Sequence, residues 1–311
     1  MALALALGLL STPSAAKSQD AASQPGGKPT FRSAVDLVSV AAVVRDRHGR
    51  FARNLKKDDF IIHEGGLRRE LLDFRTDENA PVRVALLFDV SGSMRVASHL
   101  EDARQAARYV LSSLRLDRDA DEAAVFSFDM NLQTQQPFTT DAGAIESALS
   151  RVQPYGQTSL YDAIAETAQH VAETRPGDRH RRAVVVFTDG VDTSSLMTPE
   201  HVSAVASEID VPVYVVTVVS PSMHEDVPLR TEQESPLGTL ARWTGGNLFM
   251  TSAPAHQSLA GRQIVDELRH QYLLAFAASS VKGWRPLEVK TKDKDLTVRA
   301  RSGYAAGTHG S

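Results

Sequence analysis

Short apolar runs alternate with amphipathic segments through the middle of the chain. The runs are VRVALLF, EAAVFSF, AVVVFT and VPVYVVTVV, and a polar turn flanks each one. Between them, apolar residues recur at the i, i+3, i+4, i+7 spacing of a one-sided helix, as in residues 103–114 and 160–171. Buried strands that alternate with such helices predict a doubly wound, Rossmann-like α/β domain with a mostly parallel sheet.

The sequence on both sides of this block has the rhythm of β-strands. VDLVSVAAVVRD is rich in β-branched residues, and DFIIHEGGLRRELLDF predicts two short strands around Gly65 and Gly66. After the block, strands are predicted in QYLLAFA, PLEVKT and LTVRAR, and the charged turn KDKD joins the last two. We expect the N- and C-terminal flanks to pair into one small β module.

The first residues have the features of an export signal. MALALALGLL is apolar but too short to cross a bilayer as a helix, and Ser14, Ala15 and Ala16 are the small residues that a signal peptidase requires. The sequence therefore predicts a secreted or periplasmic protein with no transmembrane segment in its mature form. The predicted parts are a signal peptide at 1–16, a linker at 17–33, an N-terminal β segment at 34–80, the α/β domain at 81–268, a C-terminal β segment at 269–304 and a tail at 305–311.

Composition excludes several kinds of chemistry. The chain of 311 residues has no cysteine, so it has no disulfide, no thiolate zinc site and no cysteine nucleophile. Its formal net charge of -4 gives no reason to expect a nucleic acid as partner. Oxygen-rich sites for a hard metal ion remain open.

Oxygen-bearing side chains follow two of the predicted strands. Asp89, Ser91 and Ser93 come at alternate positions directly after VRVALLF, and Asp189 ends AVVVFTDG. Alternate residues of an extended chain project to one side, and the carboxyl ends of parallel strands share one edge of a sheet. Thr158, in the loop GQTSL before a predicted helix, adds a fifth oxygen near that edge.

This combination of DxSxS, a Thr in GQTSL and a late TDG resembles the von Willebrand factor A (VWA) domain and its metal-ion-dependent adhesion site (MIDAS). The resemblance covers about Pro81 to Leu268, and the flanks are similar to those of exported bacterial VWA-related proteins. It implies a site for Mg²⁺ or Mn²⁺, with Ca²⁺ not excluded. Ser91, Ser93 and Thr158 would then be direct ligands, and Asp89 and Asp189 would hold bound waters.

The resemblance also implies a function. Mg²⁺ requires octahedral oxygen geometry, and neutral hydroxyl ligands leave most of its charge unquenched, so a carboxylate from elsewhere can complete its shell. We therefore expect a metal-dependent adhesion or assembly module, not an enzyme, which binds Asp or Glu of a partner protein through a bridging Mg²⁺. The alternative is a metal-dependent phosphoryl-transfer or hydrolytic enzyme with Asp89 as nucleophile. The haloacid-dehalogenase-like proteins that use this chemistry have a DxDx motif. In this chain the position of the second acidic residue is occupied by Ser91.

The same residues also have simpler interpretations. Asp89, Asp189 and Thr158 could serve only as helix caps, and the metal could serve only to tie loops together. Asp192 and Ser194 are expected in a solvated loop, and so is the charged run DRHRR at Asp178 to Arg182.

Three other features are assigned structural roles. His224, Glu225 and Asp226 lack the spacing of a metalloprotease motif and are expected in a loop. Trp243 and Trp284 are expected in the core or at a domain interface.

Overall fold

The computed structural model describes residues 37–96, 98–116, 121–154, 156–173, 178–190, 192–208, 210–218, 234–251 and 253–306. The predicted signal peptide, the linker and the segment of His224, Glu225 and Asp226 lie outside the described residues.

The chain folds into an α/β domain with strands on both sides of it in sequence. Its strands are β1 (Leu37–Arg45), β2 (Phe60–Glu64), β3 (Leu67–Arg69), β4 (Leu71–Thr76), β5 (Val82–Asp89), β6 (Glu122–Phe128), β7 (Leu132–Thr139), β8 (Arg181–Thr188), β9 (Val213–Val218), β10 (Leu248–Thr251), β11 (Tyr272–Ala277), β12 (Gly283–Thr291), β13 (Thr297–Ala300) and β14 (Gly303–Ala306). Its helices are α1 (His99–Ser112), α2 (Ala142–Arg151), α3 (Leu160–Ala172), α4 (Pro199–Glu208), α6 (Pro236–Trp243) and α7 (Pro254–Arg269), with short 3-10 turns at η1 (Lys57–Asp59) and η2 (Gly92–Arg95).

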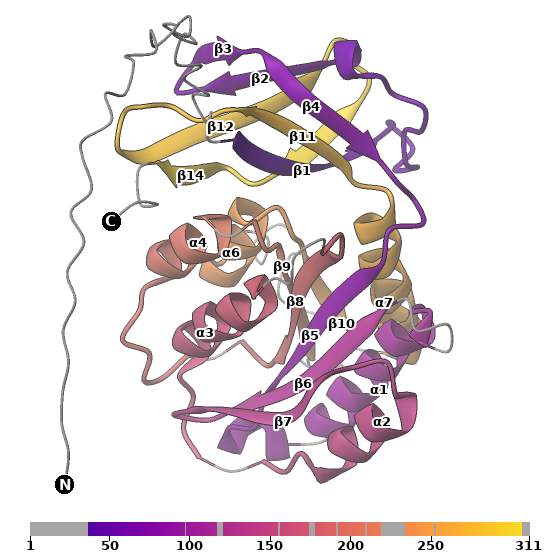
Figure 1. Cartoon of the computed structure of the whole chain (residues 1–311). Helices are drawn as coiled ribbons and strands as arrows, with labels where there is room; N and C mark the ends of the chain where they lie inside the picture. The colour runs from indigo at the N-terminus through magenta and orange to yellow at the C-terminus, as the bar shows by residue number, and fades with distance from the viewer. Residues whose placement is uncertain are drawn as a thin grey trace, which may run out of the picture. The chain divides into compact units, whose positions relative to one another are not determined.

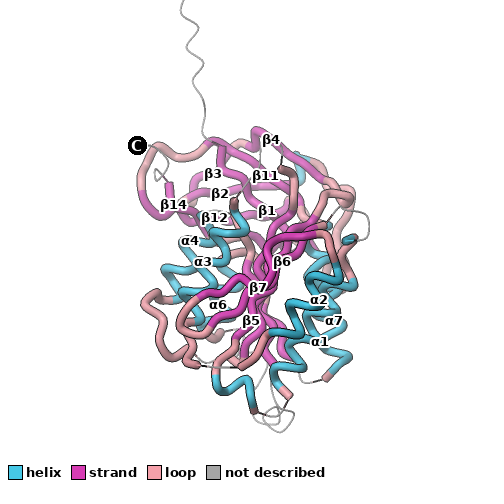
Figure 2. Tube along the Cα trace, turned by 60° about the horizontal axis from the view of Figure 1, so that its bottom comes forward, coloured by secondary structure: helices cyan, strands magenta, loops and turns pink. Residues whose placement is uncertain are grey.

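A six-stranded sheet forms the centre of the α/β domain, in the order β10-β9-β8-β5-β6-β7. Every neighbouring pair is parallel except β6 and β7. Figure 1 shows α1, α2 and α7 on one face of the sheet and α3, α4 and α6 on the other, and Figure 2 shows the same two layers. Every residue of β5 is buried, as expected for a strand covered on both faces. The prediction of a doubly wound α/β fold is confirmed.

The flanking strands form two antiparallel four-stranded sheets, β13-β1-β11-β4 and β14-β12-β2-β3. Strand β1, from the N-terminal flank, lies between β11 and β13 from the C-terminal flank, so the two flanks do pair. The inner faces of both sheets share one apolar core, which includes Val40, Ile62, Leu274 and Val289.

The pairing within this β module differs from the sequence expectation in one respect and has a second feature for which the sequence analysis made no prediction. Two strands were predicted in residues 60–76, but this segment forms three. Strand β3 pairs with β2, whereas β4 pairs with β11 in the other sheet. The strands on either side of KDKD, β12 and β13, lie in different sheets. Both carry apolar residues that face the shared core, so they pack across that core instead of along an edge.

The tryptophan prediction is wrong for Trp284, which is 43% exposed on β12. Its ring lies over Gly303 of β14, where an added Cβ would come within 2.4 Å of the ring. Trp243 is half-buried at the end of α6, and its carbonyl accepts the amide of Ser302 at 2.9 Å, which joins α6 to the flanking strands.

Ion pairs join the β module to the α/β domain. Glu267 of α7 is fully buried and pairs with Arg45 of β1 at 2.9 Å and with Arg299 of β13. Arg301 pairs with Asp210 at 3.5 Å. Val35–Ser311 accordingly form one compact unit.

Candidate metal site

The ends of two neighbouring strands bring the two predicted acidic residues to one edge of the sheet. Phe88 of β5 lies opposite Phe187 of β8, so Asp89 and Thr188 are the last residues of aligned strands and Asp189 follows. The Thr188 hydroxyl donates to Oδ2 of Asp89 at 2.7 Å. The strand register therefore fixes Asp89 beside the residue that precedes Asp189.

The DxSxS loop brings its two serine hydroxyls together. Oδ1 of Asp89 accepts the amide of Ser91 at 2.8 Å, and the hydroxyl oxygens of Ser91 and Ser93 lie 3.0 Å apart. The local conformation is not the extended chain that the alternate spacing suggested, because the 3-10 turn η2 begins at Gly92. A tight turn that follows the buried acid gives the predicted juxtaposition of the serines by a different route.

The loop that carries Thr158 is fastened to both neighbouring loops. The amide of Gly92 donates to Gly156 O at 3.1 Å, and the amide of Ser159 donates to Asp129 O at 2.8 Å. Gly156 has a φ of +103°, and a Cβ there would lie 3.0 Å from Cβ of Asp129, so glycine is required for this close approach. Thr158 is 3% exposed, and the N-cap of α3 is Ser159, so Thr158 is not the helix cap.

The sequence analysis expected Asp192 and Ser194 in a solvated loop, and this prediction is wrong. Oδ1 of Asp192 accepts the amide of Leu160 at 2.8 Å and the hydroxyl of Ser195 at 2.7 Å. The hydroxyl oxygens of Ser194 and Ser159 lie 3.0 Å apart. Asp192 thus satisfies an amide that the start of a helix leaves unpaired, and both contacts hold the loop after Asp189 against the start of α3.

Burial makes the site electrostatically unusual. Asp89 is fully buried, and this desolvation, together with the charge of Asp189, raises the pKa of its carboxyl to about 6. Oδ1 of Asp189 is buried, and no residue that the structure describes donates a hydrogen bond to it. A buried acceptor without a donor costs free energy, and a cation or a metal-bound water would relieve that cost.

The residues present fit a hard divalent ion. No group of three or more His, Cys, Asp or Glu side chains in the described parts of the chain could hold a metal by itself. Any cation at this edge would therefore need hydroxyl oxygens in addition to the two carboxylates, and Ser91, Ser93 and Thr158 would be the residues to supply them.

The sequence analysis missed two residues that shape the site. Thr188 holds the Asp89 carboxylate, and Asp129 anchors the loop of Thr158. Thr188 directly precedes Asp189 in the TDG motif, so the alignment of two strand ends could have indicated it. Asp129 acts mainly through its backbone carbonyl, and no residue pattern reveals such a role.

Thr188→Val is expected to weaken Mg²⁺ binding about 10- to 100-fold, the usual cost of losing a group that orients a metal ligand. Valine keeps the volume but cannot donate to Asp89. Calorimetric titration with Mg²⁺ measures the effect, and Thr217→Val, at the end of the neighbouring strand β9, is the matched control because its hydroxyl donates to Phe249 O. Equal affinities for Thr188→Val and wild type would contradict the role assigned to this hydroxyl.

Comparison with known proteins agrees with this architecture. Residues 84–192, which contain all five predicted site positions, match the model of the von Willebrand factor type A domain. This part of the chain is similar to a VWA domain. Because the matched residues begin within β5 and end just beyond β8, the match covers the strand ends and loops that surround Asp89.

A curated protein is similar to part of this chain. The thrombospondin-related anonymous protein of Plasmodium falciparum is 30% identical over 149 residues, which are 44% of this chain and 27% of that protein. The chain thus spans about a quarter of the length of that curated relative.

Two solved structures are similar in fold. A von Willebrand factor type A structure from Catenulispora acidiphila aligns with a TM-score of 0.49 and 13% identity, over 89% of this chain and 76% of that one. Proximal thread matrix protein 1 from the mussel byssus, whose structure has a zinc-occupied MIDAS motif, aligns with a TM-score of 0.49 and 19% identity over 66% of this chain and 49% of that one.

Proposed function

We propose that this VWA domain is a metal-dependent protein-binding module for adhesion or assembly. Asp89, Ser91, Ser93, Thr158 and Asp189 hold Mg²⁺, or Mn²⁺ in its place, and an Asp or Glu side chain of a partner protein completes the coordination shell. The buried, unpaired Oδ1 of Asp189 carries the proposal, because it is the group at this edge that most needs a cation or a bound water.

The donor set explains why the module would bind a carboxylate. Hydroxyl ligands are neutral, so a Mg²⁺ ion that they hold retains charge with which an external carboxylate can pair. The Asp89 carboxylate of the chain itself would not take the place of the partner's carboxylate, because both of its oxygens accept hydrogen bonds from within the domain.

The same observation disfavours the enzymatic alternative. A nucleophilic carboxylate must reach its substrate, whereas Asp89 is fully buried, with Oδ1 bonded to Ser91 and Oδ2 to Thr188. We expect no hydrolysis of a generic phosphate ester in the presence of Mg²⁺. Turnover that disappears in Asp89→Ala would favour the enzyme.

We also propose that the module acts outside the cytoplasm, after removal of residues 1–16. The apolar N-terminal run and the small residues that follow it support this proposal. No helix in the described part of the chain is long and apolar enough to cross a membrane. Mass spectrometry of the N-terminus of the protein from its source cells tests the cleavage site.

A capture experiment tests binding. Immobilised wild-type protein and Asp89→Ala are exposed to extracellular and periplasmic fractions of the source cells, with Mg²⁺ or with chelator. Proteins retained only by the wild type with Mg²⁺ are candidate partners, and changing their Asp and Glu residues singly to Asn and Gln must abolish retention at one position. Retention that is unaffected by both chelator and Asp89→Ala would overturn the proposal.

A further inference from the structure

A cavity of about 630 Å³ lies at the opposite end of the central sheet from Asp89. Its walls include Ser39 and Ala41 of β1, Gln271 and Leu273 at β11, and Arg181 at the start of β8. The flanking β module therefore forms one side of the cavity and the VWA domain forms the other. This volume is within the range of small-molecule binding sites.

Arg181 is a buried charge that forms no ion pair with a described carboxylate, although the charges of Asp77 and Asp210 attract it. Its side chain lines the cavity, yet the residue is only 4% exposed. One nitrogen, Nη2, donates to Gln271 O at 3.3 Å, whereas Nε and Nη1 have no hydrogen-bond partner among the described residues. Burial lowers the pKa of this guanidinium, and an unpaired buried charge is costly to the fold.

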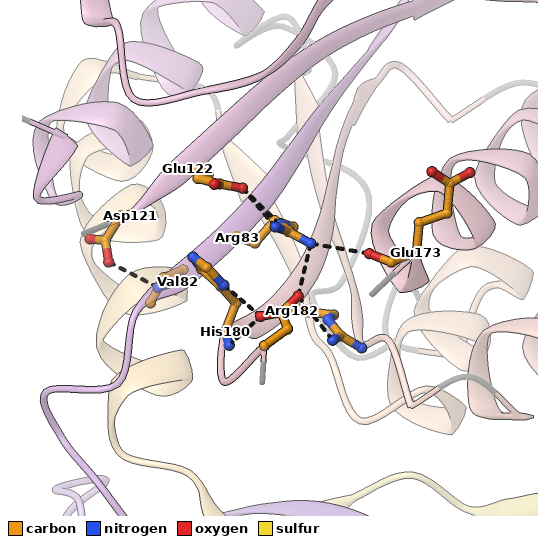
Figure 3. Close-up of polar contacts among 8 residues, drawn as sticks. Val82, Arg83, Asp121, Glu122, Glu173, His180 and Arg182 are labelled. Atoms are coloured by element: carbon orange, nitrogen blue, oxygen red, sulfur yellow. Dashed lines mark hydrogen bonds and ion pairs between the residues drawn. The ribbon is translucent and has the colours of Figure 1, made fainter. Parts of the chain in front are cut away.

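Asp178, which also lines the cavity, is already paired with other cations. Asp178 accepts from Arg83 at 3.0 Å, from Arg182 at 3.3 Å and from Nδ1 of His180 at 2.6 Å. Figure 3 labels these three donor residues. Burial would raise the pKa of Asp178, but hydrogen bonds from the amide and the ring of His180, together with the charge of Arg83, lower it to about 2. The charge of Asp178 therefore persists but is shared with these groups. The run DRHRR is consequently not the solvated turn that the sequence analysis expected.

The remaining acidic residues of the cavity are also engaged. Asp210 pairs with Arg301 at 3.5 Å, and a carboxylate oxygen of Asp77 accepts the amide of Asn79 at 2.9 Å. No carboxylate of the described residues forms an ion pair with Arg181. The charged groups that line the cavity are Arg75, Arg179, His180, Arg181, Arg182, Asp77, Asp178 and Asp210.

We propose that this cavity is an anion-binding site in which Arg181 holds the carboxylate or phosphate group of a small molecule. The planar guanidinium matches the geometry of both oxyanions, and an anion at Nε and Nη1 would satisfy the donors that the fold leaves unpaired. Arg179, which is exposed and lines the same cavity, adds a second cation for the ligand. The site is separate from the metal edge and does not require it.

Calorimetric titration with inorganic phosphate and with succinate, in the presence of chelator, tests the proposal and distinguishes phosphate from carboxylate ligands. We expect millimolar or tighter binding of at least one of them by the wild type. Arg181→Gln should weaken this binding at least about tenfold, the cost of a lost charge-assisted hydrogen bond. Arg75→Gln is the matched control, because it removes the same charge from the lining of the cavity while Arg75 already pairs with Asp73 at 2.7 Å.

Equal losses in the two variants would show that only the net charge matters and would overturn the site. Failure of both anions to bind the wild type at millimolar concentration would also overturn it.

Thermal stability separates a ligand-binding arginine from a structural one. If Arg181 serves a ligand, Arg181→Gln without anion should melt at the same or a higher temperature than the wild type, because a costly buried charge has been removed. Arg181→Lys keeps the charge without the planar fork and should bind anions more weakly than the wild type. Asp89→Asn should bind them as the wild type does, so this result is independent of the metal site.

Discussion

Asp89→Asn is expected to abolish the stabilisation of the protein by Mg²⁺ and, in the same experiment, to make the metal-free protein more stable at neutral pH. The two effects have one cause, which is the burial of a charged carboxylate beside a second one. With metal, that charge is balanced by the cation. Without metal, it lies beside Asp189 in a desolvated site.

The direction of the stability change in the metal-free protein follows from the pKa of Asp89. The folded pKa of Asp89 is about 6, above its ordinary value of 3.8, so the folded state binds the proton more tightly than the unfolded state. The metal-free wild type should therefore gain about 3 kcal/mol of unfolding free energy as the pH falls from above 6 towards 4. Asn cannot ionise, so this pH dependence should be absent from Asp89→Asn.

Thermal and urea unfolding with Mg²⁺ or chelator measure both effects. Mg²⁺ at 100 times its Kd should stabilise the wild type by about 2.7 kcal/mol and leave Asp89→Asn unchanged. Asp129→Asn is the matched control, since Asp129 follows the neighbouring strand β6 and its carboxylate accepts only the amide of Asn131 in the described structure, at 2.9 Å. If Mg²⁺ stabilised Asp89→Asn as much as the wild type, the metal site would be wrong.

The central sheet could be predicted because its information is local. Strand β5 is buried on both faces, so its whole length is apolar, and its end is marked by Asp89. Pairing in the β module could not be predicted in the same way. The residues of β12 and β13 indicate strands and an apolar face, but nothing in either segment specifies a neighbour in the same sheet or across the core.

The candidate site and the charged cluster likewise contain features that the local sequence predicts and features that depend on remote segments. Side chains at strand ends, such as Asp89 and Asp189, follow from the sequence because parallel strands end at one edge. The charged run at 178–182 was misjudged because its partners are remote: Arg83 lies 95 positions before Asp178 and comes from the neighbouring strand β5. A run of charged residues predicts a solvent-exposed segment, because its oppositely charged partners from other segments cannot be identified from the run itself.

Asp178→Ala is expected to lower the free energy of unfolding by about 3 to 5 kcal/mol, the cost of leaving a buried partner uncompensated. The side chain of Asp178 is 2% exposed and that of Arg83 is 6% exposed. Glu122 still pairs with Arg83 at 2.8 Å in the variant, so the lower part of the range is expected. Urea unfolding at neutral pH measures the change, and Asp73→Ala, which removes an exposed pair with Arg75, should cost no more than about 1 kcal/mol.

Acid should reproduce this loss in the wild type, in the opposite direction from the effect of Asp89. The folded pKa of Asp178 is about 2, below its ordinary value of 3.8, so its contribution is present above pH 4 and is lost as the pH falls towards 2. That contribution is about 2 kcal/mol. Between pH 4 and 2 the stability of the wild type should therefore fall more steeply than that of Asp178→Ala. Parallel pH profiles for the two proteins would show that the Asp178 carboxylate does not bind the Arg83 guanidinium in solution as it does in this structure.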